Sequence, residues 1–372
     1  MLAGVRVPFV DLNQRIAEER EELRTCLDRV LDSTQLILGP SVESFEAAAA
    51  RAIGVPHVIG LNSGTDALMM ALWSLGIGKG AEVITSPVSF VATTGAIVHV
   101  GARPIYVDVS ADQNLDPDRI EAAITPRTKA IVAVHWGGRV AAMDRIGEIA
   151  KVHGLAVIED AAQAMGATYR GSHAGTFGAA AAFSAHPLKL LAALGDAGFL
   201  ALRDVDAARR VRLHRTHGLE TRDHCVEYGV NSRLDALHAA ILEMRLATLP
   251  ALIERRQRNV AIYRELVNQG PIVLPAEEPH ERIAWTFFNA QAERRDELRT
   301  YLADHGVETQ LYYATALHLH PAAAALGYSR GSFPIAEAQC DRVVALPIHQ
   351  HVTEEQVAYV ADRINAFYRT AA

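Results

Sequence analysis

The chain has few cysteines and no pattern of residues that would hold a metal ion. Its three cysteines, Cys26, Cys225 and Cys340, are widely spaced across 372 residues. They predict neither a disulfide framework nor a Cys-x-x-Cys site, and the scattered histidines lack metal-ligand spacing. We therefore expect a protein of the reducing cytoplasm that binds no metal.

Excess basic charge and long apolar runs are missing as well. The formal net charge is −7, whereas a general nucleic-acid binder carries a basic patch that attracts phosphates. No run reaches the roughly 20 apolar residues that a membrane-spanning helix needs. The first residues, MLAGVRVPFVDL, do not resemble a signal peptide. We expect neither a nucleic acid nor a membrane as partner.

What is present indicates a large α/β protein. Half of the residues are hydrophobic, enough for an extensive core. Short apolar runs alternate with helical patterns, which predicts a mostly parallel sheet with helices on both faces. We expect a large domain over residues 1–245 and a smaller α+β domain over 246–372. The expected strands of the large domain include 57–61, 82–86, 104–107, 129–135 and 156–160.

One lysine lies in an unusually apolar context. Lys189 is flanked by Leu188, Leu190 and Leu191. Burial disfavours the charged form of a lysine, and a neutral amine is a nucleophile that condenses with aldehydes and ketones. The alternative is a lysine that extends from an apolar loop into solvent, and Lys189 and its neighbours alone do not decide between the two.

A carboxylate ends one of the expected buried strands. Ala156-Val157-Ile158 leads into Glu159 and Asp160, and ligands of open α/β sheets bind at the carboxyl ends of strands. A carboxylate there can keep a pyridine nitrogen protonated, as pyridoxal phosphate (PLP) requires beside its lysine. Asn62-Ser63-Gly64-Thr65 precedes another expected helix, and such a helix start can bind phosphate or can be an ordinary N-cap.

Several motifs together resemble the DegT/DnrJ/EryC1/StrS family of PLP-dependent sugar aminotransferases. The likeness extends from VPFVDLNQ at 7–14 to the C-terminal helix. Three positions differ from those of many relatives: Ala185, Leu190 and Ala197. The motifs are NSGTDAL at 62–68, PVSFVAT at 87–93, EDAAQAMGA at 159–167, SAHPLK at 184–189, LGDAG at 194–198 and YGVNSRLDALHAA at 228–240.

This resemblance implies a fold type I PLP-transferase and a role for each matching residue. Lys189 would form the Schiff base with PLP, and Asp160 would hold the pyridine nitrogen. Phe90 would stack on the ring, and Gln163 would reach the ring hydroxyl. Asn231 would contact the phosphate in the partner subunit, which implies a homodimer with its active site at the interface. The other implied phosphate ligands are Ser63, Gly64, Thr65 and Ser184.

The resemblance also implies a reaction. The amino donor would be L-glutamate or L-glutamine, and the acceptor a keto-sugar linked to a nucleotide such as dTDP, UDP or GDP. LGD at 194–196 is similar to members that act at C3 of the sugar. Tyr313, His318 and His186 are candidate substrate contacts. A cyclitol ketone as acceptor, a different fold type I enzyme such as a lyase, and a non-catalytic regulator remain alternatives.

Overall fold

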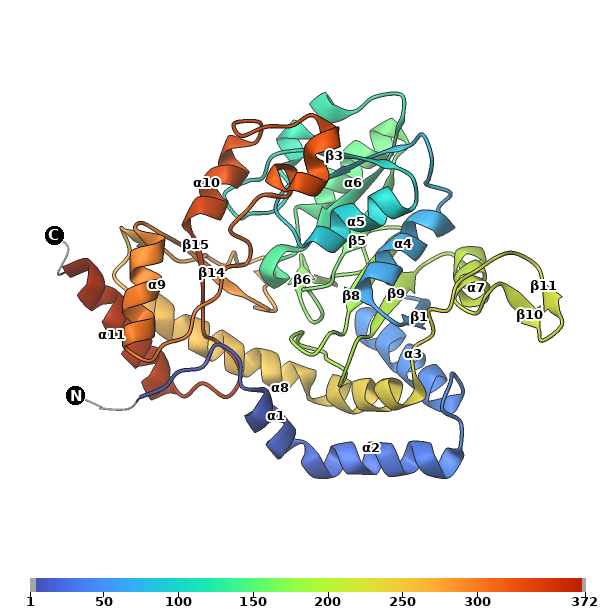
Figure 1. The fold of residues 1–372 in the computed structure, drawn as a ribbon, viewed down its shortest axis with the longest axis horizontal. Helices are drawn as coiled ribbons and strands as arrows, with labels where there is room; N and C mark the ends of the chain where they lie inside the picture. The colour runs from blue at the N-terminus through green and yellow to red at the C-terminus, as the bar shows by residue number, and fades with distance from the viewer. Residues whose placement is uncertain (1–4, 370–372) are drawn as a thin grey trace.

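A seven-stranded sheet is the centre of the large lobe in the computed structural model, which describes residues 5–369 (Figure 1). Its strand order is β1-β9-β8-β5-β4-β2-β3. Six strands point the same way, and β9 runs antiparallel to both of its neighbours. The predicted mostly parallel sheet is therefore confirmed. The strands are β1 (His57–Leu61), β2 (Glu82–Thr85), β3 (Arg103–Tyr106), β4 (Thr128–Val134), β5 (Ala156–Asp160), β8 (Ala180–Ser184) and β9 (Gly198–Leu202).

Helices cover both faces of this sheet. Successive strand residues point to opposite sides, so each strand presents apolar side chains to both layers of helices. Ile131 of β4 packs with one set of helices, and its neighbours Ala130 and Val132 pack with the other. The first set is α3 (Pro40–Ile53), α6 (Met143–His153) and the start of α8 (Ala236–Leu266). The second set is α4 (Gly64–Ser74), α5 (Val91–His99) and α7 (Val205–His214).

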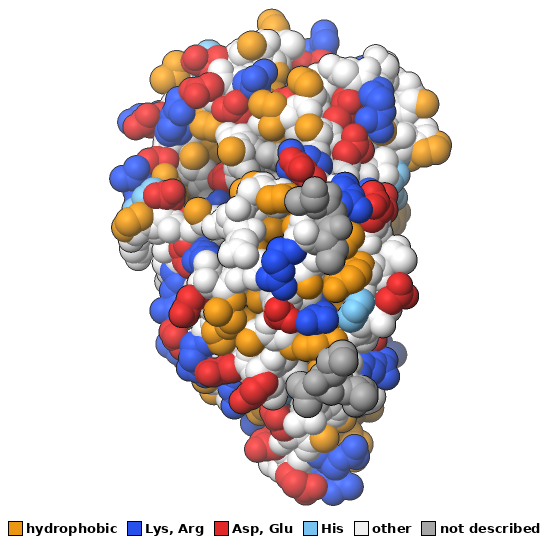
Figure 2. Space-filling model, turned by 90° about the vertical axis from the view of Figure 1, so that its left-hand side faces the viewer, with side chains coloured by type: hydrophobic (Ala, Val, Ile, Leu, Met, Phe, Trp, Pro, Cys, Tyr) orange, Lys and Arg blue, Asp and Glu red, His pale blue; other side chains and the backbone are white. Residues whose placement is uncertain are grey.

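A smaller lobe follows, built on an antiparallel sheet of β12 (Ile272–Val273), β14 (Phe288–Ala292) and β15 (Val343–Leu346). The helices α9 (Arg295–Asp304), α10 (Pro334–Arg342) and α11 (Glu354–Arg369) pack around it. The spacing of Val357, Val360, Ile364 and Phe367 predicts an inner stripe on the last helix, and this is confirmed because all four are buried. On the face of this end of the molecule, acidic and basic side chains are interspersed (Figure 2).

The short elements complete the described chain. Residue 245, the expected end of the large domain, lies inside α8, whose second half contributes Val260 and Tyr263 to the core of the smaller lobe. The short strands are β6 (Thr168–Tyr169), β7 (Ser172–His173) and β13 (Glu281–Arg282), which pair with one another, and the hairpin β10 (Leu219–Thr221) and β11 (His224–Cys225). The 3₁₀ turns are Pro117–Arg119, Glu121–Ala123, Trp136–Gly138, Leu317–Leu319 and Pro321–Leu326.

The apolar spacing of Ile16, Leu23, Leu27 and Leu31 predicts one helix over residues 11–32 with these side chains inside, and the structure differs. The chain forms α1 (Leu12–Glu18) and α2 (Arg20–Ser33), with Glu19 between them. The predicted inner stripe was wrong for Leu27 and Leu31, whereas Leu23 packs against the cluster between α2 and α8. Cys26 and Val30 pack against α8, so that Leu27 and Leu31 lie on the other side and are 41% and 55% exposed.

Helix α8 is long and apolar enough to cross a membrane by length and composition alone. In its most apolar 18-residue window, 44% of the residues are buried inside the protein. The helix packs against α2, α3 and α11 and links both lobes. These contacts are those of a central core helix.

We predict that Phe199→Ala strongly destabilises the large lobe. Phe199 is 1% exposed, and its ring stacks on Phe183 at 4.8 Å and meets the edge of Phe45 at 5.5 Å. Removing a buried aromatic ring leaves a cavity and costs about 3–5 kcal/mol. The free energy of unfolding from denaturant titration measures the loss. Val152→Ala, at a side chain that is 77% exposed, should change it by less than about 0.5 kcal/mol. Equal effects of the two substitutions would contradict the prediction.

Candidate active site

A cavity of about 380 Å³ opens at the carboxyl edge of the large sheet. Residues that follow β1, β2, β5 and β8 line it, as expected for a ligand site of an open α/β sheet. Ten of the twelve residues predicted from the sequence are brought together here. They are Ser63, Gly64, Thr65, Phe90, Asp160, Gln163, Ser184, His186, Lys189 and Tyr313.

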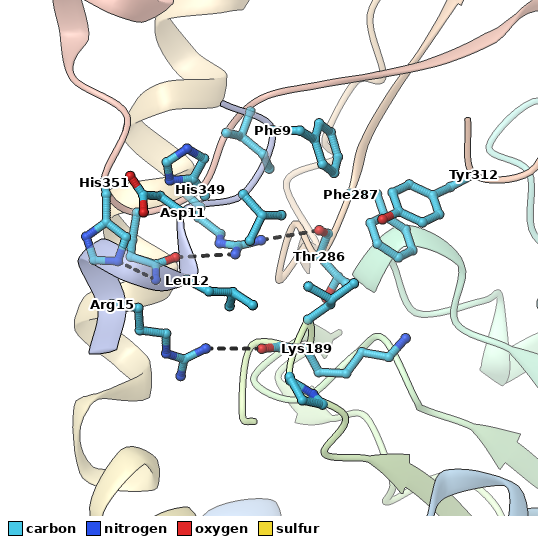
Figure 3. Close-up of a pocket in the computed structure, with 16 residues that line it drawn as sticks. Phe9, Asp11, Leu12, Arg15, Lys189, Thr286, Phe287, Tyr312, His349 and His351 are labelled. Carbon is cyan, nitrogen blue, oxygen red and sulfur yellow. Dashed lines mark hydrogen bonds between the residues drawn. The ribbon is translucent and has the colours of Figure 1, made fainter. Parts of the chain in front are cut away.

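Lys189 reaches this cavity from the loop after β8. Its side chain extends toward Phe287 and Tyr312, away from Arg15 (Figure 3), and its Nζ lies 5.7 Å from the centre of the Phe287 ring. Burial lowers the pKa of Lys189 to about 8, although the charge of Asp160 opposes this shift. A substantial fraction of the amine is therefore neutral slightly above neutral pH.

Two buried arginines hold the backbone of the lysine loop from behind. Arg15 of α1 donates to the carbonyls of Lys189 and Leu190 at 3.4 and 3.3 Å. Arg245 of α8 donates to the carbonyls of Ala192 and Ala193. Both guanidinium groups pair with Glu19, at 3.2 Å from Arg15 and 2.5 Å from Arg245. Because the loop carbonyls are bonded on this side, the lysine side chain is left to extend into the cavity.

Asp160 is the buried acid of the site. It is 5% exposed, and its two carboxylate oxygens accept from the Thr93 hydroxyl at 2.6 Å and from the N–H of Ala162 at 3.3 Å. Burial raises the pKa of Asp160, while these donors and the charge of Lys189 act in the opposite direction. The neighbouring Glu159 instead bonds His135 at 2.8 Å. His135 is fully buried, and in this pairing it supports the strand.

The start of α4 forms another wall. Ser63 is the N-cap, and its hydroxyl accepts from the N–H of Asp66 at 3.0 Å. The N–H groups of Gly64 and Thr65 belong to the first turn and have no partner within the helix. Such groups, together with the helix dipole, attract an anion. Ser184 lies against this turn, since a Cβ on Gly64 would be 2.7 Å from the Ser184 side chain.

Aromatic and amide side chains complete the lining. Phe90 is 51% exposed, and its ring lies 5.8 Å from that of Tyr313. Burial raises the pKa of Tyr313. The side-chain oxygen of Gln163 accepts from the N–H of Gly137 at 2.7 Å, which leaves its NH₂ group to donate elsewhere. The cavity therefore offers a flat aromatic surface together with polar donors.

Two predicted residues lie elsewhere. His318 is 2% exposed, bonds Glu337 at 2.9 Å and packs on Phe333, so it does not line the cavity. Its burial against an acid explains the difference from the expected substrate contact. Asn231 is exposed on the loop before α8, bonded to Arg233 at 3.0 Å, and is not part of the cavity of its own chain.

Other lining residues were missed in the sequence. Thr93 lies within PVSFVAT, and its position three residues after Phe90 places both on one side of a helical turn. That spacing is the signal that could have identified it. Phe287 and Tyr312 also line the cavity and stack at 3.9 Å. They come from segments 25 residues apart, and no local pattern predicts their contact.

We predict that Gly198→Ala disturbs the α4 wall. Gly198 begins β9, and a Cβ there would lie 2.5 Å from the backbone N of Gly64 and closer still to the carbonyl carbon of Ser63. The backbone must move, so the melting temperature should fall by several degrees, as for a loss of about 1–3 kcal/mol. Gly147→Ala in α6 is the control, because a Cβ added there would meet no atom within 4 Å. It should stabilise the protein by up to about 1 kcal/mol, since alanine favours a helix more than glycine does. A Gly198→Ala protein that melts like the wild type would contradict this account.

Comparisons with known proteins agree with this geometry. The model of the DegT/DnrJ/EryC1/StrS aminotransferase family matches residues 17–365. The chain is 42% identical over 361 residues to dTDP-3-amino-3,4,6-trideoxy-alpha-D-glucose transaminase of Streptomyces venezuelae, covering 96% of this chain and 95% of that protein. It is 40% identical over 369 residues to a pleiotropic regulatory protein of Geobacillus stearothermophilus, covering 98% and 99%. The crystal structure of DesV from S. venezuelae, solved with a ketimine intermediate, superposes with a TM-score of 0.95 at 41% identity, covering 98% and 99%. The chain belongs to the DegT/DnrJ/EryC1/StrS aminotransferase family.

Proposed function

We propose that this protein is a PLP-dependent aminotransferase that transfers an amino group from L-glutamate or L-glutamine to a nucleotide-linked keto-sugar. One observation carries the proposal: a desolvated lysine, a buried carboxylate and a helix N-terminus line one cavity. We further propose that it acts in the cytoplasm.

The residues of the cavity fit PLP. The first turn of α4 and the Ser184 hydroxyl suit a phosphate, Phe90 suits the face of a flat ring, and Asp160 suits a protonated ring nitrogen. When bound, PLP supplies an electron sink that stabilises negative charge at the carbon next to the amino nitrogen. The NH₂ group of Gln163, whose oxygen is already bonded to Gly137, would donate to a ring oxygen.

Lys189 is the group that binds the cofactor carbonyl and moves the proton. With a pKa of about 8, roughly a tenth of its amine is neutral at pH 7, compared with well under a thousandth for an ordinary lysine. The neutral amine is both nucleophile and general base. Asp160 holds the proton on the ring nitrogen, and the arginines behind the loop keep Lys189 aimed at the cavity.

We assign amination to C3 of the sugar. Names of similar proteins support this choice, including the S. venezuelae transaminase above and a UDP-N-acetyl-3-dehydro-alpha-D-glucosamine 3-aminotransferase of Acidithiobacillus ferrooxidans that is 38% identical. Asp196 of the LGD motif lines the cavity together with His186 and Tyr313. These polar groups are the ones we propose to contact the sugar hydroxyls.

A homodimer completes this proposal. Asn231 is exposed and lies outside the cavity of its own chain, as a residue that serves a partner must. Exposed apolar side chains also gather on α2 and the segment after it: Leu27, Leu31, Leu36 and Ile37 are each 41–58% exposed. Several exposed apolar side chains on one segment favour contact with a second copy.

We predict that PLP-loaded protein mixed with L-glutamate releases 2-oxoglutarate, as the absorption band of the aldehyde form gives way to that of the amine form. A panel of nucleotide keto-sugars should then restore the first band. Lys189→Met should slow 2-oxoglutarate release by about 10²- to 10⁴-fold, because proton transfer is lost. Lys151→Met, at an exposed position of α6, is the control. PLP binding without conversion to the amine form by either L-glutamate or L-glutamine would favour a regulator or a lyase instead.

A second prediction tests the shared site. Lys189→Ala removes the amine, and Asn231→Asp places a negative charge where the partner's phosphate would lie. The homodimer of either variant should therefore release little 2-oxoglutarate at limiting PLP. Subunit exchange between the two should restore about a quarter of the sites, because half of the dimers are mixed and each mixed dimer has one intact site. If Asn231 acted within its own chain, no site would be restored, and the mixture would stay inactive.

A further inference from the structure

Two hydroxyl groups lie in line behind Asp160. The Oγ atom of Ser89 is 2.6 Å from Oγ1 of Thr93, which in turn is 2.6 Å from Oδ2 of Asp160. The three residues are 3%, 1% and 5% exposed, so water does not compete for these bonds. An ionised carboxylate only accepts, and a threonine hydroxyl has one proton. Thr93 therefore donates to Asp160, and Ser89 donates to Thr93.

The same turn carries the aromatic residue of the cavity. Phe90 is the N-cap of α5, and the N–H of Thr93 bonds the carbonyl of Phe90 at 3.1 Å. Ser89 comes directly before Phe90. The two hydroxyls thus tie Asp160 of β5 to the turn that places Phe90.

We propose that Ser89 and Thr93 form a positioning relay that keeps the Asp160 carboxylate ionised and aimed into the cavity, and thereby sustains binding of a cationic aromatic ring at low pH. This inference rests on the proposed PLP-dependent function. Neither hydroxyl is assigned a step in the reaction; both act through Asp160.

The charges around Asp160 give the direction of the effect. Burial raises the pKa of Asp160, and the Thr93 hydroxyl is the largest influence that lowers it. The N–H of Ala162 and the electrostatic influence of Lys189 and His135 also lower it. Besides burial, the charge of Asp160 in turn helps to raise the pKa of the nearby Tyr313 hydroxyl. Without the Thr93 hydroxyl the pKa of Asp160 rises further. The ionised form, present above that pKa, is then lost at a higher pH as the solution is acidified.

The test is the dissociation constant of PLP, measured by equilibrium binding to the apoprotein between pH 6 and pH 8. Thr93→Val keeps the shape of the side chain and removes the hydroxyl. It should weaken binding about 10- to 100-fold at pH 6, the worth of a hydrogen bond to a charged group, and less at pH 8. Thr93→Ser should bind nearly as the wild type does. Ser89→Ala should lose only a few-fold, because Thr93 keeps its own proton.

Thr94→Val is the matched control. Thr94 is the next residue of α5, but its hydroxyl bonds Tyr106 at 2.9 Å and does not line the cavity. The relay would be overturned if Thr93→Val bound PLP as tightly as Thr94→Val does. It would also be overturned if Thr93→Val weakened PLP binding by the same factor at every pH. If the wild-type protein bound no PLP at all, the proposed function would fall, and the relay with it. If the wild-type protein bound PLP and Thr93→Val bound it equally well, the relay would be overturned but the proposed function would stand.

Discussion

Desolvation of Lys189 opposite Asp160 is the constraint on which the rest of the site depends. An amine with a pKa near 8 and a buried acid with a raised pKa coexist because each charge favours the other, while burial disfavours both. The pair therefore needs donors and a fixed backbone to keep it in place. The hydroxyl of Thr93 is such a donor, and the two arginines behind the lysine loop fix the backbone.

Parallel strands explain how the functional groups meet. Asp160, Ser184 and the Ser63 turn end three strands that point the same way, so they meet at one edge of the sheet although they lie far apart in the sequence. The antiparallel strand β9 brings Gly198 against the Ser63–Gly64 backbone, where no side chain fits. The fold thus places an anion site, an acid and an amine around one cavity.

Much of this was predictable from local patterns. The strand before Asp160, the capped helix after Ser63 and the apolar setting of Lys189 each follow from short stretches whose periodicity and flanking residues are informative. Features set by tertiary contacts were not predictable in this way. The bonds from Arg15 to the lysine loop join residues 174 or more apart. Which face of α2 is buried depends on the side that meets α8. The position of His318 depends on its hydrogen bond to Glu337.

The chain contains only four lysines, Lys79, Lys129, Lys151 and Lys189, which makes the central claim easy to examine. The most direct measurement is to incubate the protein with PLP, reduce it with borohydride and map the modified peptide by mass spectrometry. The account predicts a single phosphopyridoxyl group on Lys189, formed fastest above about pH 8, the pKa of its amine. Modification spread over the other three lysines, with Lys189 unlabelled, would contradict it.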